Sequence, residues 1–181
     1  AVSEYLKNNY YLRNKYAIYL MKKYLVTGAA GFIGANFVKY MLSKYDDIYI
    51  VILDKLTYAG NLGTIKKEIE DSRVEFVLGD ICDKEKVSEI FSKHDIDYVV
   101  NFAAESHVDR SITNPQLFLE TNILGTQNML ECAKQAWTTG KDSNGYPTYK
   151  EGKKYLQVST DEVYGSLSKD YDKPQPLEIT D

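Results

Sequence analysis

The sequence predicts an α/β protein built on a doubly wound, parallel sheet. Five short apolar runs recur along the chain, at residues 24–26, 48–53, 74–78, 97–102 and 154–159. Segments with helical spacing separate the first four runs and follow the fourth. Strands that alternate with helices in this way pair in parallel through right-handed crossovers. In such sheets, ligands bind beyond the carboxyl ends of the strands.

The expected helices follow from apolar spacing and caps. The first begins at Phe32, and a polar helical stretch ends near Asp71. Asp83 is the expected cap of the next helix, and a long helix is expected over residues 115–136. The apolar positions that predict these helices are Ile33, Phe37, Val38, Met41 and Leu42, then Val87, Ile90 and Phe91, then Leu117, Phe118, Thr121, Leu124 and Asn128. Residues 137–152 are polar and rich in turn formers, which predicts a surface loop.

Length and composition limit the function classes. The chain has 181 residues and a net charge of −4, which argues against a general nucleic-acid surface. Cys82 and Cys132 lack metal-ligand spacing and are expected to be reduced thiols of a cytoplasmic protein. No metal site and no membrane span are expected.

Residues 1–20 differ in composition from the rest of the chain. They hold five tyrosines and scattered basic residues, with no signal-peptide core. We interpret them as a leader or extension, although their Tyr/Leu spacing also allows an amphipathic helix that docks on the domain. Residues 21–181 form the expected domain, beginning at Met21.

A glycine turn follows the first strand. Gly28, Gly31 and Gly34 are spaced in threes between that strand and the first helix. Gly28 would let the chain turn tightly, and Gly31 would let the backbone approach a pyrophosphate. Gly34 would let the helix pack closely on the strand. The spacing is G-x-x-G-x-x-G, not the commoner G-x-G-x-x-G, so the second strand is needed as further evidence.

The second strand ends in Asp54, twenty residues beyond Gly34. A carboxylate there can accept hydrogen bonds from both ribose hydroxyls of NAD and would repel the extra phosphate of NADP. The alternative is a structural aspartate at a strand end. The glycine turn and Asp54 together predict an NAD-binding domain of the Rossmann type, in which Gly28, Asp54, Asp80, Ala103 and Ser159 converge.

Polar clusters follow the fourth and fifth strands. After Ala103 and Ala104 come Glu105 and Ser106, and then a polar run that ends in Arg110 and Ser111. The density of polar residues favours a site, and the alternative is that Glu105, Asp109 and Arg110 form a solvated turn with a surface ion pair. The fifth strand leads into Thr160, Asp161 and Glu162. Adjacent carboxylates suit paired acid and base work, or else a capping or solvated role.

These motifs resemble the dTDP-glucose 4,6-dehydratases, which are lyases of the extended short-chain dehydrogenase/reductase superfamily. The resemblance runs from about Met21 to Asp181 and rests on residues 27–34, 54–61, 103–112 and 159–165. UDP-glucose 4,6-dehydratases carry very similar motifs and are the nearest alternative. UDP-galactose 4-epimerases share the glycine loop but lack the Asp-Glu pair.

The resemblance implies site residues by motif. NAD would be bound by Gly28, Gly31, Phe32, Ile33, Gly34, Asp54, Lys55, Leu56, Thr57, Asp80, Ile81, Phe102, Ala103, Ala104, Glu105, Ser106 and Thr121. Ser106 and Thr160 would also bind the nucleotide sugar, and Thr160, Asp161 and Glu162 would be catalytic. In this family a tyrosine and NAD first oxidise sugar carbon 4. Glu162 would then take the proton from carbon 5 while Asp161 protonates the leaving hydroxyl of carbon 6.

The family's Tyr-x-x-x-Lys pair lies on a helix after the fifth strand, and the printed sequence reaches Asp181 before it. The same spacing occurs elsewhere, as at Tyr146 and Lys150, but not after the fifth strand. We expect the cofactor half of a dehydratase, truncated before the sixth strand and the substrate domain and inactive alone, with activity and homodimerisation in the longer parent. The alternative of another class is an NAD-binding module without catalysis.

Overall fold

The computed structural model describes residues 18–160. Its central sheet has five parallel strands in the order β3-β2-β1-β4-β7, which confirms the predicted fold class. The strands are β1 (Lys22–Thr27), β2 (Ile48–Asp54), β3 (Val74–Leu78), β4 (Tyr98–Asn101) and β7 (Lys154–Gln157). The chain moves outward from β1 to β3 and then returns to β4 on the other side of β1. The strand order therefore reverses between β1 and β4, where such sheets bind their ligands.

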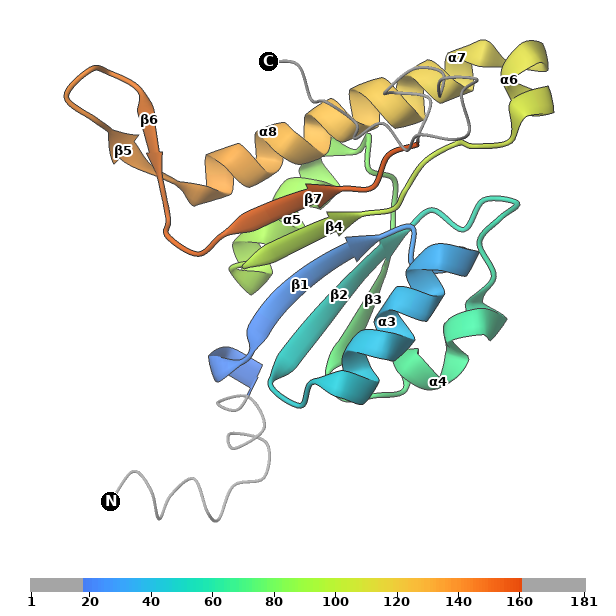
Figure 1. The fold of residues 1–181 in the computed structure, drawn as a ribbon, viewed down its shortest axis with the longest axis horizontal. Helices are drawn as coiled ribbons and strands as arrows, with labels where there is room; N and C mark the ends of the chain where they lie inside the picture. The colour runs from blue at the N-terminus through green and yellow to red at the C-terminus, as the bar shows by residue number, and fades with distance from the viewer. Residues whose placement is uncertain (1–17, 161–181) are drawn as a thin grey trace, which may run out of the picture.

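Helices cover both faces of the sheet (Figure 1). One face carries α3 (Phe32–Lys44), the short 3₁₀ helix η1 (Leu62–Ile65) and α4 (Lys66–Ile69). The other carries α5 (Lys84–His94) and α8 (Thr126–Trp137). Asp83 caps α5 as predicted, because its side chain accepts a hydrogen bond from the Lys86 N–H at 2.9 Å.

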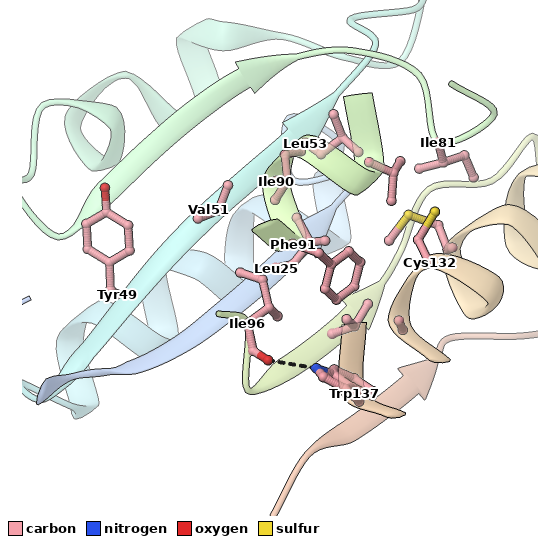
Figure 2. Close-up of a cluster of buried hydrophobic side chains, with 14 residues drawn as sticks. Leu25, Tyr49, Val51, Leu53, Ile81, Ile90, Phe91, Ile96, Cys132 and Trp137 are labelled. Carbon is pink, nitrogen blue, oxygen red and sulfur yellow. Dashed lines mark hydrogen bonds between the residues drawn. The ribbon is translucent and has the colours of Figure 1, made fainter. Parts of the chain in front are cut away.

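Alternation along β2 supplies two separate cores. Tyr49, Val51 and Leu53 face α5 and α8, whereas the intervening isoleucines face α3. Figure 2 shows the first cluster, in which Trp137 closes one end and donates from Nε1 to the Ile96 carbonyl at 2.8 Å. The strand β2 is thus buried on both faces, as its continuous apolar sequence predicts, whereas most residues of the edge strand β7 are exposed.

Two predictions about helix faces need correction. Ile33 was expected on the buried face of α3, yet it is 63% exposed, and the buried positions are Gly34, Ala35, Val38 and Met41. Leu124 is also exposed. The helix predicted over residues 115–136 consists of α7 (Pro115–Phe118), the π-helical segment η2 (Leu119–Gly125) and α8. Because a π turn holds more residues than an α turn, it shifts the apolar stripe around the axis.

The prediction of a surface loop over residues 137–152 is wrong. Residue 137 ends α8, and the segment after it forms an antiparallel hairpin of β5 (Thr138–Lys141) and β6 (Pro147–Tyr149). Its side chains are polar and largely exposed, so no apolar alternation marked the strands. The hairpin projects from the end of the sheet opposite the strand carboxyl ends (Figure 1).

Within residues 18–160, no helix is long and apolar enough to cross a membrane. The predicted leader falls mostly outside the described residues. Ile18, near its end, packs against the core cluster that Trp137 closes. The division into residues 1–20 and 21–181 stays a prediction.

Candidate functional site: a cavity at the carboxyl ends of the strands

A cavity of about 400 Å³ lies where the carboxyl ends of the strands meet. This volume is within the range of roughly 300–1,000 Å³ that is usual for ligand pockets. The convergence predicted for the strand ends is confirmed, because Gly28, Asp54, Asp80, Ala103 and Ser159 all line the cavity.

The predicted site residues are brought together with few exceptions. The cavity is lined by Gly28, Gly31, Phe32, Ile33, Gly34, Asp54, Lys55, Thr57, Asp80, Ile81, Phe102, Ala103, Ala104, Glu105, Ser106, Thr121 and Thr160. Leu56 does not line the cavity. Its backbone N–H donates a hydrogen bond to the Asp54 carboxylate, which does. Asp161 and Glu162 lie outside the described residues. The roles assigned to these residues stay predictions.

The glycine turn forms the floor of the cavity because it has no side chains there. Gly28 has a φ of +65°, and a Cβ at this position would stand 2.7 Å from the Ala103 nitrogen. A Cβ on Gly34 would stand 2.5 Å from the Gly28 carbonyl oxygen. Only glycine allows β1, the start of α3 and the loop after β4 to approach this closely. The N-terminus of α3 consequently opens into the cavity, where its free N–H groups favour an anion.

Asp54 is held rigidly at the end of β2. Its side chain is buried, Oδ2 accepts from the Ala30 N–H and Oδ1 from the Leu56 N–H, both at 2.8 Å. Leu56 itself has a φ of +53°. The carboxylate therefore links the glycine turn to the loop after β2, and its position is fixed before any ligand arrives.

An ion pair forms the wall between β2 and β3. Lys55 Nζ lies 2.5 Å from Asp80 Oδ2, and the Cys82 N–H donates to Asp80 Oδ1 at 2.9 Å. Burial alone would raise the pKa of Asp80, but the Cys82 N–H and the Lys55 ammonium outweigh it and hold that pKa below its ordinary value. The hydrogen bond to Asp80 raises the pKa of Lys55. Both groups are thus charged at neutral pH.

Side-chain hydrogen bonds fix the strand ends beneath the cavity. The Thr27 hydroxyl donates to Asn101 Oδ1, and Asn101 Nδ2 donates to Gln157 Oε1 at 2.8 Å. The Ala103 N–H donates to the same Thr27 hydroxyl at 3.2 Å. This chain of bonds joins β1, β4 and β7 at the point where each leads into the cavity wall.

Glu105 contradicts the interpretation of its cluster as a solvated turn. The residue is 6% exposed, and its Oε2 has no hydrogen-bond partner. Asn122, in η2, holds the Glu105 backbone from both sides, because its amide accepts from the Glu105 N–H and donates to the Glu105 carbonyl, each at 2.8 Å. Sequence reasoning missed Asn122, since its partner is seventeen positions away. Asp109, in contrast, is exposed, and it lies on the short helix α6 (Val108–Thr113) and not in a turn.

Further lining residues were not predicted individually. Leu53, Ala59, Gly60, Gly79 and Val158 also line the cavity. Ala59 and Gly60 lie within the motif over residues 54–61, and the other three each precede a predicted site residue or a motif, so nearness to the motifs is the signal that could have found them. Among the described residues, no group of three His, Cys, Asp or Glu side chains is arranged to hold a metal ion.

The residues present fit a dinucleotide. The glycine turn leaves the floor free of side chains at Gly28 and Gly34, and a fixed carboxylate ends β2 beside it. Glu105 also lines the cavity. Fold and site together define an α/β domain of the Rossmann type, with its cavity at the topological switch point between β1 and β4.

The chain belongs to the GDP-mannose 4,6 dehydratase family, whose model matches residues 25–178. It is 44% identical over 158 residues to a dTDP-glucose 4,6-dehydratase of Salmonella typhimurium, covering 87% of this chain and 40% of the relative. This confirms the resemblance predicted from the motifs. The chain spans about 40% of the length of the curated relatives it matches.

Solved structures agree with this assignment. The dTDP-glucose 4,6-dehydratase of Bacillus anthracis, in complex with NAD, superposes with a TM-score of 0.65 at 40% identity, over 82% of this chain and 40% of that one. A dTDP-glucose 4,6-dehydratase of Streptomyces venezuelae, with NAD and a second ligand bound, gives a TM-score of 0.68 at 41% identity, over 81% and 42% of the two chains.

Proposed function

We propose that this chain is the cofactor-binding part of an NAD-dependent dTDP-glucose 4,6-dehydratase. The observation that carries the proposal is the buried Asp54 carboxylate, fixed at the end of β2 beside the glycine turn. A charged acceptor at this point suits the two ribose hydroxyls of NAD and disfavours NADP. The relatives named above support the particular reaction.

The cavity residues would hold NAD in a single direction. Asp54 would accept from the adenosine ribose, and the N-terminus of α3 would bind the pyrophosphate. Asp80 and Ile81 would flank the adenine, while residues 102–106 and Thr121 would line the nicotinamide half. When bound, NAD would accept a hydride from sugar carbon 4, and the reduced cofactor would return that hydride to carbon 6.

The chain's own residues would carry the elimination of water. Thr160, which lines the cavity, would hold the oxygen on sugar carbon 4 by its hydroxyl. A ketone at carbon 4 makes the proton on carbon 5 acidic, so a base beside carbon 5 and an acid beside carbon 6 suffice. We assign Glu162 as that base and Asp161 as that acid, on the strength of the family motif.

The test is turnover by the full-length protein. Incubation with dTDP-glucose should give a nucleotide sugar lighter by one water, detected by mass spectrometry, with no net reduction of added NAD. Glu162→Gln should lower the rate of product formation by at least about a hundredfold, in keeping with the loss of a general base. Product formation at the parental rate in this variant would refute the acid–base assignment.

Parallel assays decide the nucleotide. Faster turnover of UDP-glucose than of dTDP-glucose would move the assignment to the UDP-glucose 4,6-dehydratases. Binding of NAD without turnover of either sugar would instead support a non-catalytic NAD-binding module. Failure to bind NAD at all would refute the cofactor assignment.

We also propose that the protein is a homodimer through η2 and α8. Leu119, Ile123, Leu124 and Leu130 on these segments are each 47–58% exposed, so they leave an apolar stripe on the surface of the described residues. A second copy of the same helices would cover it symmetrically. Sedimentation of the full-length protein should show a dimer, and Leu130→Glu should shift it toward monomer.

A further inference from the structure

Two loops form opposite walls of the cavity. The loop after β2 contributes Thr57 and Ala59, and the segment after β4 contributes Glu105 and Ser106. Because β1 lies between β2 and β4, the two walls rise on either side of the glycine turn. Among the described residues, no hydrogen bond joins the loop over residues 55–60 to the segment over residues 103–110.

Side-chain contacts at the Tyr58 ring do join the two walls. The guanidinium carbon of Arg110 lies 3.9 Å from the centroid of the Tyr58 ring. His107 approaches the same ring edge-on, at 6.5 Å between centroids. Tyr58 is 56% exposed and does not itself line the cavity, unlike Thr57 and Ala59 on either side of it. A planar guanidinium at this distance attracts the ring face by a cation–π interaction.

Arg110 also lies near the buried carboxylate of Glu105. Glu105 Oε2 has no hydrogen-bond partner, and Arg110 Nη1 lies 4.0 Å from it. The Glu105 side chain is only 5% exposed, so its charge is poorly hydrated and strongly attracts a nearby cation. Arg110 thus contacts the Tyr58 ring and also lies within ion-pair distance of the Glu105 carboxylate.

We propose that Arg110 and Tyr58 form a wall contact that holds the two loops around the bound dinucleotide and slows its release. The inference rests on the proposed function, in which NAD is bound in this cavity. Because NAD is regenerated within each catalytic cycle of that function, its release is not needed for turnover. A contact that slows the release of NAD would therefore not lower the turnover rate.

The experiment measures release of NADH from the full-length protein. The protein is loaded with fluorescent NADH, mixed rapidly with excess NAD, and the decay gives the dissociation rate constant. Tyr58→Leu removes the ring and should raise this rate constant about three- to tenfold, whereas Tyr58→Phe keeps the ring face and should stay close to the parental rate. Arg110→Met should raise it at least as much as Tyr58→Leu.

A matched control comes from α3. Tyr40 is also exposed and also carries a cation over its ring, since Lys44 Nζ lies 5.0 Å from the ring centroid, but it does not line the cavity. Tyr40→Leu should leave the release rate unchanged. The double variant Tyr58→Leu/Arg110→Met should release NADH no faster than Arg110→Met alone, because one shared contact can be lost only once.

Three results would overturn the inference. Tyr58→Leu could release NADH within twofold of the parental rate, Tyr58→Phe could release it as fast as Tyr58→Leu, or the effects of the two single variants could multiply. Each of these leaves the proposed function intact, because the parental protein would still bind NADH. A parental protein that binds no NADH would refute the proposed function, and this inference with it.

Discussion

Replacing Asp54 with asparagine tests the centre of the site. The carboxylate accepts from two backbone N–H groups at 2.8 Å, one on each oxygen. An asparagine offers only one oxygen, so whichever way its amide turns, the NH₂ group meets the N–H of Ala30 or Leu56. One buried donor then loses its partner, which costs about 1–3 kcal/mol. Asp54→Asn should lower the free energy of unfolding of the unliganded protein by that amount.

The same change should act on cofactor choice. Hydrogen bonds from ribose hydroxyls to a charged acceptor contribute about 1.5–3 kcal/mol. Losing that charge should therefore weaken NAD binding roughly 10- to 100-fold. NADP should lose less, because the repulsion of its phosphate is removed at the same time. The preference for NAD over NADP should shrink.

Titration calorimetry with NAD and with NADP, together with urea unfolding, measures both effects in the full-length protein. Asp83→Asn is the matched control, because Asp83 caps α5 and does not line the cavity. Asparagine caps a helix about as well as aspartate, so neither stability nor affinity should change appreciably. If Asp54→Asn weakened the binding of NAD and of NADP by the same factor, Asp54 would not be the residue that distinguishes the ribose hydroxyls of NAD from the phosphate of NADP.

Three other changes have definite expected results. Gly34→Ala places a Cβ 2.5 Å from the Gly28 carbonyl oxygen and 2.8 Å from the Ala29 Cα. It should therefore weaken NAD binding and lower the free energy of unfolding by about 1–3 kcal/mol. A melting temperature equal to that of the parental protein would contradict this. Trp137→Phe removes the bond from Nε1 to the Ile96 carbonyl and part of the buried ring, and urea unfolding should show a loss of about 1–3 kcal/mol with little change in NAD affinity. Asp71→Asn acts through pH. The hydrogen bond from Arg73, at 2.8 Å, lowers the pKa of Asp71, so this pair stabilises the protein above the ordinary aspartate pKa of about 3.9 and the contribution is lost as the pH falls through the lower, folded pKa. Acid unfolding curves of the variant should therefore be less steep below about pH 4 than those of the parent, and identical curves would show that the pair contributes nothing.

The sequence predicted those parts of the fold that depend on local pattern. Each strand of the central sheet was expected within two residues of its observed bounds at both ends, because buried parallel strands are continuous apolar runs. Asp83 was recognised as a cap since the cap and its helix are neighbours in sequence. The glycine turn and Asp54 were recognised because their spacing is fixed by the geometry of one strand, one turn and one helix.

What could not be predicted depends on residues far apart in the chain. Nothing near Asn122 indicates that its amide holds the backbone of Glu105, and nothing near Arg110 indicates that it lies over Tyr58. The hairpin of β5 and β6 was missed for another reason. Two exposed strands bury neither face, so the alternation that marks a half-buried strand is absent.

The burial of Glu105 excludes, for this residue, the solvated turn that the sequence had left as an alternative. A run of charged residues after a strand is usually solvated, but here the backbone of Glu105 is held by Asn122 and its side chain is turned inward. The position of the side chain is thus decided by η2, which lies later in the sequence. The residues next to Glu105 in the sequence therefore do not indicate that its side chain is buried.

The cavity is built before a ligand binds, and this determines how binding energy is used. Asp54 is held by two backbone donors, Asp80 by Lys55 and the Cys82 N–H, and Glu105 by Asn122 on both sides of its peptide. Groups that are already ordered lose little conformational entropy when a ligand arrives. The loop that carries Tyr58 and the short helix α6, which carries Arg110, are the exception, because no hydrogen bond among the described residues joins them and their contact is made at the Tyr58 ring. Affinity should therefore depend mainly on the fixed carboxylate, and the rate of release mainly on the wall contact, so that Asp54→Asn and Tyr58→Leu should have separable effects on the two quantities.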